Sequence, residues 1–168
     1  MQIPSDFINF NTVKSDDIPE IQLYMDQVLD FFETKLGANK RTDQEPIFTK
    51  TMINNYVKAN VVPSPVKKKY AKEAIMDLIM VYAFKQVLSL QDTKSLIKAL
   101  NQIEAEPYNH FISTEEAILS ALKADYIGNE IDSDETLIAQ IVALTLEASI
   151  KKRLAEKLLD QLSNSDSK

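Results

Sequence analysis

TKTMINNYVKANVVPSPVKKKYAKEAIMDL, residues 49–78, carries the strongest structural signals in this chain. Its first part shows the helical spacing of apolar residues, and Thr49 is a residue type that caps a helix N-terminus. Asn60 tolerates the left-handed backbone that often follows a helix. We therefore predict a short helix over residues 49–59.

The middle of this stretch, VVPSPVKKKY, predicts an extended basic segment over residues 61–70. Pro63 and Pro65 oppose an early return to helix, and three consecutive lysines follow them. We call residues 61–70 the wing and expect at most a tiny two-stranded sheet there. The next helix is predicted over residues 71–87, and its broad apolar face implies burial.

Outside this stretch, apolar residues at helical spacing predict further helices. One covers residues 21–36 and ends at Gly37. Ser89 and Ser113 each begin a capping-box pattern, which predicts the starts of a fourth and a fifth helix. A long sixth helix is predicted from about residue 136 to residue 162. Two glycines and six prolines are few turn residues for strands, so the predicted fold class is all-α.

The charge distribution sets one segment apart from the rest of the chain, whose net charge is −6. Residues 40–72 hold eight bases and two acids, a balance of +6, whereas residues 1–39 carry −5 and residues 73–168 carry −7. A solvated lysine-rich loop would explain such a segment. However, polar side chains that can bind phosphates or base edges alternate with these lysines, which favours contact with double-stranded DNA.

The candidate DNA contacts fall into two groups. The exposed face of the helix over 49–59 is predicted to read bases, and the wing to bind phosphates without reading sequence. Tyr56 and Tyr70 are ambiguous, because tyrosine rings either pack in a core or contact phosphates. The base-reading candidates are Thr51, Asn54, Asn55 and Lys58. The phosphate-binding candidates are Thr49, Lys50, Tyr56, Lys67, Lys68, Lys69 and Tyr70.

Several other functions find little support in the sequence. The chain has no cysteine, and its one histidine, His110, has no metal-ligand companion at helical spacing. Two isolated glycines cannot form a phosphate-cradling loop. We therefore expect no enzyme activity, no cofactor and no metal, and we find no mark of an effector pocket. The absence of a signal peptide pattern and of a long apolar run predicts a cytoplasmic protein with no membrane partner.

The last predicted helix carries an apolar seam with spacings of four and three, which is typical of a coiled coil. Such a seam can pair with the same seam of a second copy of the chain. A second apolar stripe, residues 138–154 at every fourth position, widens the face, so packing against the fifth helix of the same chain is an alternative. The dimerisation candidates are Leu137, Ile141, Leu144, Ala148, Leu158 and Leu162.

Three motifs resemble those of MerR-type transcriptional regulators. Residues 52–63, MINNYVKANVVP, resemble the family's T-I-R-Y-Y-E-x-x-G-L-L-P, and residues 68–78, KKYAKEAIMDL, resemble R-x-Y-S-x-x-D-I-x-x-L. Residues 87–96, VLSLQDTKSL, are similar to G-F-S-L-x-E-I-K-x-L. Asn54 departs from the family by standing where a phosphate-binding arginine is usual. Over its full length the chain resembles an uncharacterised bacterial family, domain of unknown function eighteen-thirty-six.

This resemblance implies a MerR-like winged helix-turn-helix, a transcriptional regulator and a homodimer that binds a palindromic operator. The competing interpretation is a helical adaptor that binds an acidic protein partner and has no DNA-binding activity. The implied organisation is an N-terminal extension, a DNA-binding domain, a C-terminal helical region with a dimerisation role and a polar tail. Their bounds are residues 1–19, 20–102, 103–163 and 164–168.

Overall fold

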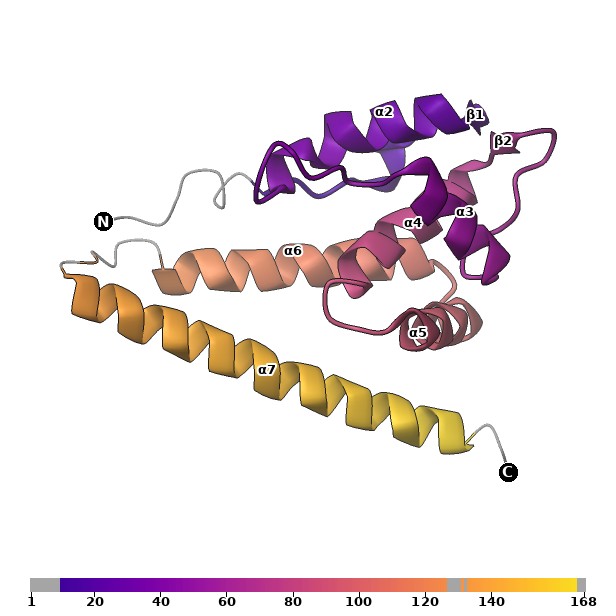
Figure 1. Cartoon of the computed structure of the whole chain (residues 1–168). Coiled ribbons are helices and arrows are strands. Elements are labelled where there is room, and N and C mark those ends of the chain that lie inside the picture. Colours follow the sequence, from indigo (N-terminus) through magenta and orange to yellow (C-terminus); the bar gives the residue numbers. More distant parts are fainter. Residues whose placement is uncertain (1–9, 127–130, 132, 166–168) are drawn as a thin grey trace.

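The computed structural model describes residues 10–126, 131 and 133–165, and this part of the chain is mostly helical (Figure 1). None of the described helices is both long and apolar enough to cross a membrane. In chain order the elements are η1 (Ser15–Asp17), β1 (Leu23–Tyr24), α2 (Met25–Leu36), η2 (Gly37–Asn39), α3 (Lys50–Lys58), β2 (Lys69–Tyr70), α4 (Lys72–Phe84), α5 (Leu90–Ile103), α6 (Pro107–Tyr126) and α7 (Asp134–Ser165).

The predicted caps of two helices are confirmed. The Thr49 hydroxyl accepts a hydrogen bond of 3.2 Å from the backbone N–H of Met52, which starts α3. The Ser89 hydroxyl accepts one of 3.1 Å from the N–H of Asp92, which starts α5. Asn60, just past α3, has a φ of 55° and lies in the left-handed region expected of it.

The start of the first predicted helix is wrong, because residues 23–24 form a strand before α2 begins. β1 pairs antiparallel with β2, so that Leu23 lies opposite Tyr70 and Tyr24 opposite Lys69. This long-range pairing outweighs the helical spacing of the same residues. The third predicted helix is also shorter than expected, since α4 ends at Phe84.

The wing ends in a tight hairpin. Val66 and Lys69 form an antiparallel bridge, with both backbone hydrogen bonds between them near 3.0 Å. The two residues at the tip, Lys67 and Lys68, have φ angles of 50° and 66°. Two consecutive left-handed residues are the geometry of a type I′ turn, in which Asn and Gly are preferred. Lysine at both positions is therefore conformationally costly.

The predicted start of the fifth helix is wrong as well, because α6 begins at Pro107. Proline is favoured at the first position of a helix, where its missing N–H costs nothing. The hydroxyls of Ser113 and Thr114 donate to the carbonyl of His110 within the helix, at 3.0 and 2.9 Å. Serine and threonine can make this bond in a helix interior, so the Ser113 pattern does not mark a start.

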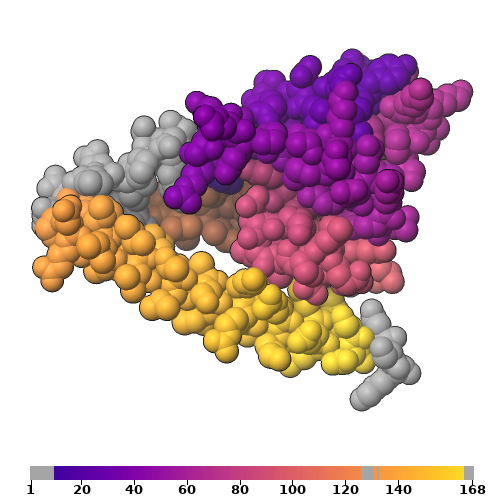
Figure 2. Space-filling model, in the orientation of Figure 1, coloured from indigo at the N-terminus to yellow at the C-terminus, as the bar shows by residue number. Residues whose placement is uncertain are grey.

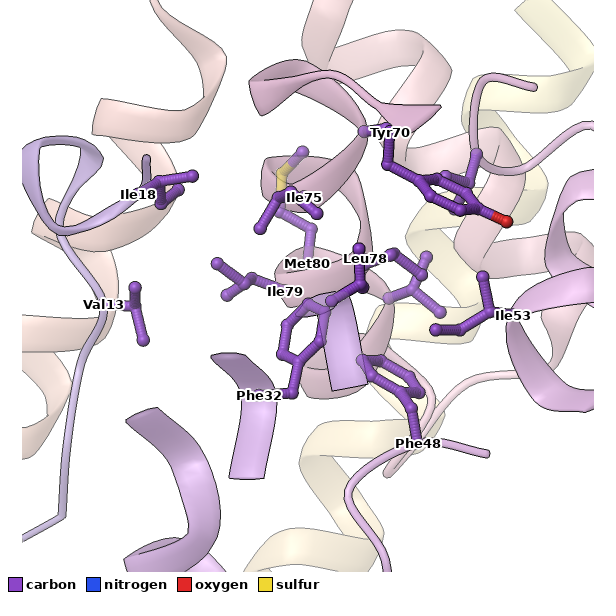
Figure 3. Close-up of a cluster of buried hydrophobic side chains, with 14 of the residues drawn as sticks. Val13, Ile18, Phe32, Phe48, Ile53, Tyr70, Ile75, Leu78, Ile79 and Met80 are labelled. Atoms are coloured by element: carbon purple, nitrogen blue, oxygen red, sulfur yellow. The ribbon is translucent and has the colours of Figure 1, made fainter. Parts of the chain in front are cut away.

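A core shared by α2, α3 and α4 holds the N-terminal part of the molecule together (Figure 3). Phe48, which precedes α3, packs against three other rings, with its ring centroid 4.7 Å from that of Phe32 and about 6 Å from those of Tyr56 and Tyr82. Ile53 and Leu78 are fully buried beside these rings. Each such side chain contributes roughly 1.5–3 kcal/mol by leaving water, which fixes α3 against α4.

Asp77 is a half-buried acid on α4 that should weaken the fold at neutral pH. Burial, with a smaller effect from Glu73, raises the pKa of its carboxyl from 3.8 to about 6. The folded protein therefore binds this proton more tightly than the unfolded chain, and stability falls as pH rises from about 4 to 6. Asp77→Asn should raise the free energy of unfolding at pH 7.5 by about 1–2 kcal/mol.

Urea unfolding of Asp77→Asn at pH 7.5 and at pH 4 tests this prediction. The gain should shrink at pH 4, where the Asp77 carboxyl is protonated in the folded state. Asp30→Asn, at an exposed position on α2, is the matched control and should change stability by less than about 0.5 kcal/mol at either pH. An equal gain for Asp77→Asn at both pH values would contradict the role of its charge.

The long helix α7 lies along one side of the molecule (Figures 1 and 2). It packs mainly against α5 and buries Leu159. Most of its other large apolar side chains are exposed. The exposed apolar side chains of α7 between residues 138 and 162 form a surface that we call the ridge.

Candidate nucleic-acid interface

The four predicted base-reading residues share one exposed face of α3. Counted from Thr51, the other three follow after three, four and seven residues, and this spacing places all of them on one face of a helix. All four side chains are exposed. On the opposite side Ile53 and Tyr56 are buried in the core. α3 is thus held from behind and presents Thr51, Asn54, Asn55 and Lys58 to solvent.

The C-terminal end of α3 is held by a contact that the sequence did not indicate. The Lys94 ammonium, on α5, donates a hydrogen bond of 2.9 Å to the carbonyl of Ala59, the residue that follows α3. A cation at this end of a helix also interacts favourably with the helix dipole. Because 35 residues separate the partners, only the tertiary fold brings them together.

Lys94→Met should lower the free energy of unfolding by about 1–2 kcal/mol, because it keeps the aliphatic stem but leaves the Ala59 carbonyl without its charged donor. Chemical denaturation measures this loss. Lys98→Met is the matched control, since Lys98 lies one turn further along α5 and is exposed. Equal effects of the two substitutions would show that the contact with α3 contributes nothing.

The wing places two lysines at its tip. Lys67 and Lys68 are exposed, and neither forms an ion pair within the part of the chain that the structure describes. Lys69 is half-buried, with its ammonium 4.9 Å from the centre of the Tyr24 ring. Figure 1 shows the wing reaching outward between α3 and β2. The tip therefore carries two unneutralised charges, and Lys69 serves partly to hold the hairpin to β1.

Carboxylates of the same chain neutralise part of the basic segment. Lys40 contacts Glu33 at 2.7 Å, Lys50 contacts Asp26 at 2.7 Å, and Lys72 contacts Glu20. The Lys50 pair is exposed on both sides, so water and salt weaken it and a phosphate could displace the carboxylate. The unpaired positive surface is consequently narrower than the sequence predicts. The exposed bases of residues 40–72 that form no ion pair within the described part of the chain are Arg41, Lys58, Lys67 and Lys68.

The two ambiguous tyrosines lie in the core. Tyr56 is 8% exposed and Tyr70 is 3% exposed, and burial raises the pKa of both hydroxyls. Of the two roles that the sequence left open, this position favours packing over phosphate contact. Thr49, a further phosphate-binding candidate, is half-buried and caps α3, and its hydroxyl accepts a hydrogen bond from the backbone N–H of Met52.

The dimerisation candidates on α7 are largely uncovered. Ile141 is 53% exposed and Leu158 is 56% exposed, while Leu137 is half-buried. Leu144 and Ala148 border an open hollow that faces Ile118, Ala121 and Leu122 of α6, and Leu162 is also exposed. The second stripe is 50–63% exposed, more than most of the seam: Ile138, Val142, Leu146, Ile150 and Leu154.

The chain was compared with protein families, curated proteins and solved structures, and a family matches. The model of a family described as Domain of unknown function (DUF1836) matches residues 13–119. The matched segment contains α3, the wing and the core that supports them. No curated protein and no solved structure matches the chain significantly.

Proposed function

We propose that this chain, which belongs to the DUF1836 family, is a sequence-specific DNA-binding regulator of transcription. The observation that carries the proposal is the pair of exposed lysines at the wing tip, Lys67 and Lys68, which form no ion pair within the described residues and lie beside a helix whose exposed face is polar. The order of helix, helix, basic wing and helix also supports a MerR-like winged helix-turn-helix. Binding, and no catalysis, is the role that we propose.

In this proposal α3 enters the major groove, which is about 12 Å wide and accepts one helix. Asn54 and Asn55 can each form two hydrogen bonds to an adenine edge, and Thr51 and Lys58 can donate to other bases or phosphates. Lys67 and Lys68 bind the neighbouring phosphate backbone and release counterions. Lys94 positions α3 from behind without contacting DNA.

We also propose that α7 pairs two copies of the chain. Nine large apolar side chains on α7 are at least 39% exposed, which is unusual for a helix of a monomeric protein. A second copy of the same ridge would cover them. A dimer with twofold symmetry would place two α3 helices on the half-sites of a palindromic operator.

The charges along α7 favour an antiparallel pairing. Residues 134–149 carry three acids and no base, whereas residues 150–165 carry four bases and two acids. An antiparallel arrangement brings the acidic half of each helix against the basic half of the other. A parallel arrangement would place like charges together, which is destabilising.

Selection of bound fragments from random duplex DNA tests the proposed function directly. We expect enrichment of a palindromic, adenine-containing site, and an affinity that falls steeply between 50 and 200 mM salt. Undetectable binding to duplex DNA at low salt would instead favour the adaptor interpretation, in which the basic surface meets an acidic protein.

Asn54→Ala and Asn55→Ala test the base-reading role. Each should relax the sequence preference and weaken binding to the selected site by about tenfold, since a bidentate contact is worth roughly 1–3 kcal/mol of discrimination. Affinity for unrelated duplexes should stay nearly constant. Fluorescence anisotropy on selected and scrambled duplexes separates the two effects, and an equal loss on every sequence would refute the role.

A further inference from the structure

A hollow of about 530 Å³ lies behind α3, on the side away from the proposed DNA-reading face. It is bordered by residues 10–13, by the loop over residues 39–48, and by α3 and α4. This volume is within the range of pockets that bind small molecules, about 300–1,000 Å³. The DNA-binding proposal makes no use of this hollow.

Specific hydrogen bonds hold the walls of the hollow in place. Two hydrogen bonds of 2.9 Å join Asn11 to Asn39: the backbone N–H of Asn11 donates to the Asn39 Oδ1, and the Asn39 Nδ2 donates to the backbone carbonyl of Asn11. The Glu33 carboxylate accepts from the N–H of Ile47 at 2.9 Å and pairs with Lys40. Lys40 and the N–H of Ile47 together lower the pKa of Glu33. The loop over 39–48 is thereby tied to α2 and to the N-terminal segment.

The lining combines aromatic rings with polar groups that have no partner among the described residues. Phe48, Tyr56 and Tyr82 contribute rings, and the hydroxyls of both tyrosines form no hydrogen bond within the described residues. Arg41 and Lys85 also line the hollow, and neither forms an ion pair in that part of the chain.

The remaining titratable groups around the hollow are acids and a paired lysine. Lys40 is already neutralised by Glu33, while Glu45 is exposed at the rim. Glu115 is half-buried, and burial together with Glu116 raises the pKa of its carboxyl. Arg41 and Lys85, which form no ion pair within the described residues, therefore share the hollow with one exposed acid, Glu45, and one half-buried acid, Glu115.

We propose that this hollow binds a small aromatic carboxylate, with its ring against Phe48, Tyr56 and Tyr82 and its carboxylate on Arg41 and Lys85. Arginine is suited to this role because its planar guanidinium can bind a carboxylate through two parallel hydrogen bonds. Tyr82 and Tyr56 supply further donors at the ring wall. Since Tyr56 and Met52 belong to α3, the bound molecule would touch the back of the helix that we propose reads DNA.

Titration of the full chain with three isosteric probes tests this site, and it does not depend on DNA binding. The probes are 1-naphthoate, 1-naphthylmethanol and 1-naphthylmethylamine, followed by calorimetry. We expect 1-naphthoate to bind at a single site at least about tenfold more tightly than the alcohol or the amine. Arg41→Gln with Lys85→Gln should remove this preference and leave binding of the alcohol unchanged, because the aromatic wall is intact.

Two further variants complete the test. Ala83→Phe adds a ring to the lining and should abolish binding of all three probes, while Lys98→Gln with Lys123→Gln should change none of them. Thermal unfolding of each variant verifies that it is folded. Equal affinities for the three probes, tighter binding of the amine, or no saturable binding of 1-naphthoate at 1 mM would each overturn the proposal.

Discussion

Lys67→Asn combined with Lys68→Gly is expected to weaken binding to duplex DNA by at least about tenfold while leaving the fold as stable or making it more stable. The two substitutions remove the charges at the wing tip, and the slope of log affinity against log salt should fall by about two for each copy of the chain bound. They also place the preferred residues of a type I′ turn at φ angles of 50° and 66°. The hairpin should gain up to about 1 kcal/mol.

Because DNA affinity should fall while stability stays the same or rises, a loss of binding could not be attributed to unfolding. Electrophoretic mobility or anisotropy at several salt concentrations gives the affinity and the slope, and differential scanning calorimetry gives the unfolding temperature. Lys98→Gln with Lys123→Gln removes the same charge from α5 and α6 and should change the salt slope by less than about 0.5. An unchanged slope in the wing variant would show that Lys67 and Lys68 do not contact phosphates.

Ile141→Glu combined with Leu158→Glu is expected to convert a dimer into a monomer, raising the dissociation constant of the dimer at least about 100-fold. Both side chains are more than half exposed, so the fold of one copy should tolerate glutamate there. In a paired interface, however, each carboxylate would replace an apolar contact and lose its water, which costs several kcal/mol. Sedimentation equilibrium over a range of concentrations measures the change.

A second pair of substitutions distinguishes the two apolar stripes of α7. Leu146→Glu with Ile150→Glu places charges on the second stripe, whereas Ile141 and Leu158 belong to the seam. If only the second-stripe pair produces monomers, the interface is the second stripe and the seam faces the chain's own α5 and α6. Ser149→Glu, at an exposed position that shares a polar face of α7 with Thr145 and Lys152, is the control and should remain dimeric. An unchanged variant series, or a monomeric parent protein, would contradict pairing through α7.

Features that depend on neighbouring residues could be predicted from the chain itself. The Thr49 and Ser89 caps, the left-handed Asn60 and the exposed face of α3 all arise from contacts within about four residues, so sequence spacing reports them. The charge of the wing is likewise a local property. The helical fold class followed from the scarcity of turn residues and from apolar periodicity.

The two wrong helix starts have different causes, a distant strand in one case and a nearby proline in the other. Residues 23–24 pair with residues 69–70 as strands despite their helical spacing, and Ser113 lies inside α6 because Pro107 starts that helix earlier. The ion pair of Lys50 with Asp26 could not be expected either, since 24 residues separate the two side chains in the chain. Apolar spacing reports neither the strand pairing nor the ion pair, because each joins segments that are far apart in the chain.

By itself, the order of residues determined the helices, the polar face of α3 and the position of the basic wing, because hydrogen bonding and periodicity act over a few residues. Only the tertiary structure decided which lysines stay unpaired, that Tyr56 and Tyr70 are buried, and that Lys94 holds the end of α3. It also created the hollow behind α3 and left most of the large apolar side chains of α7 exposed. These features depend on where packing places residues that are far apart in the chain, which no local preference encodes.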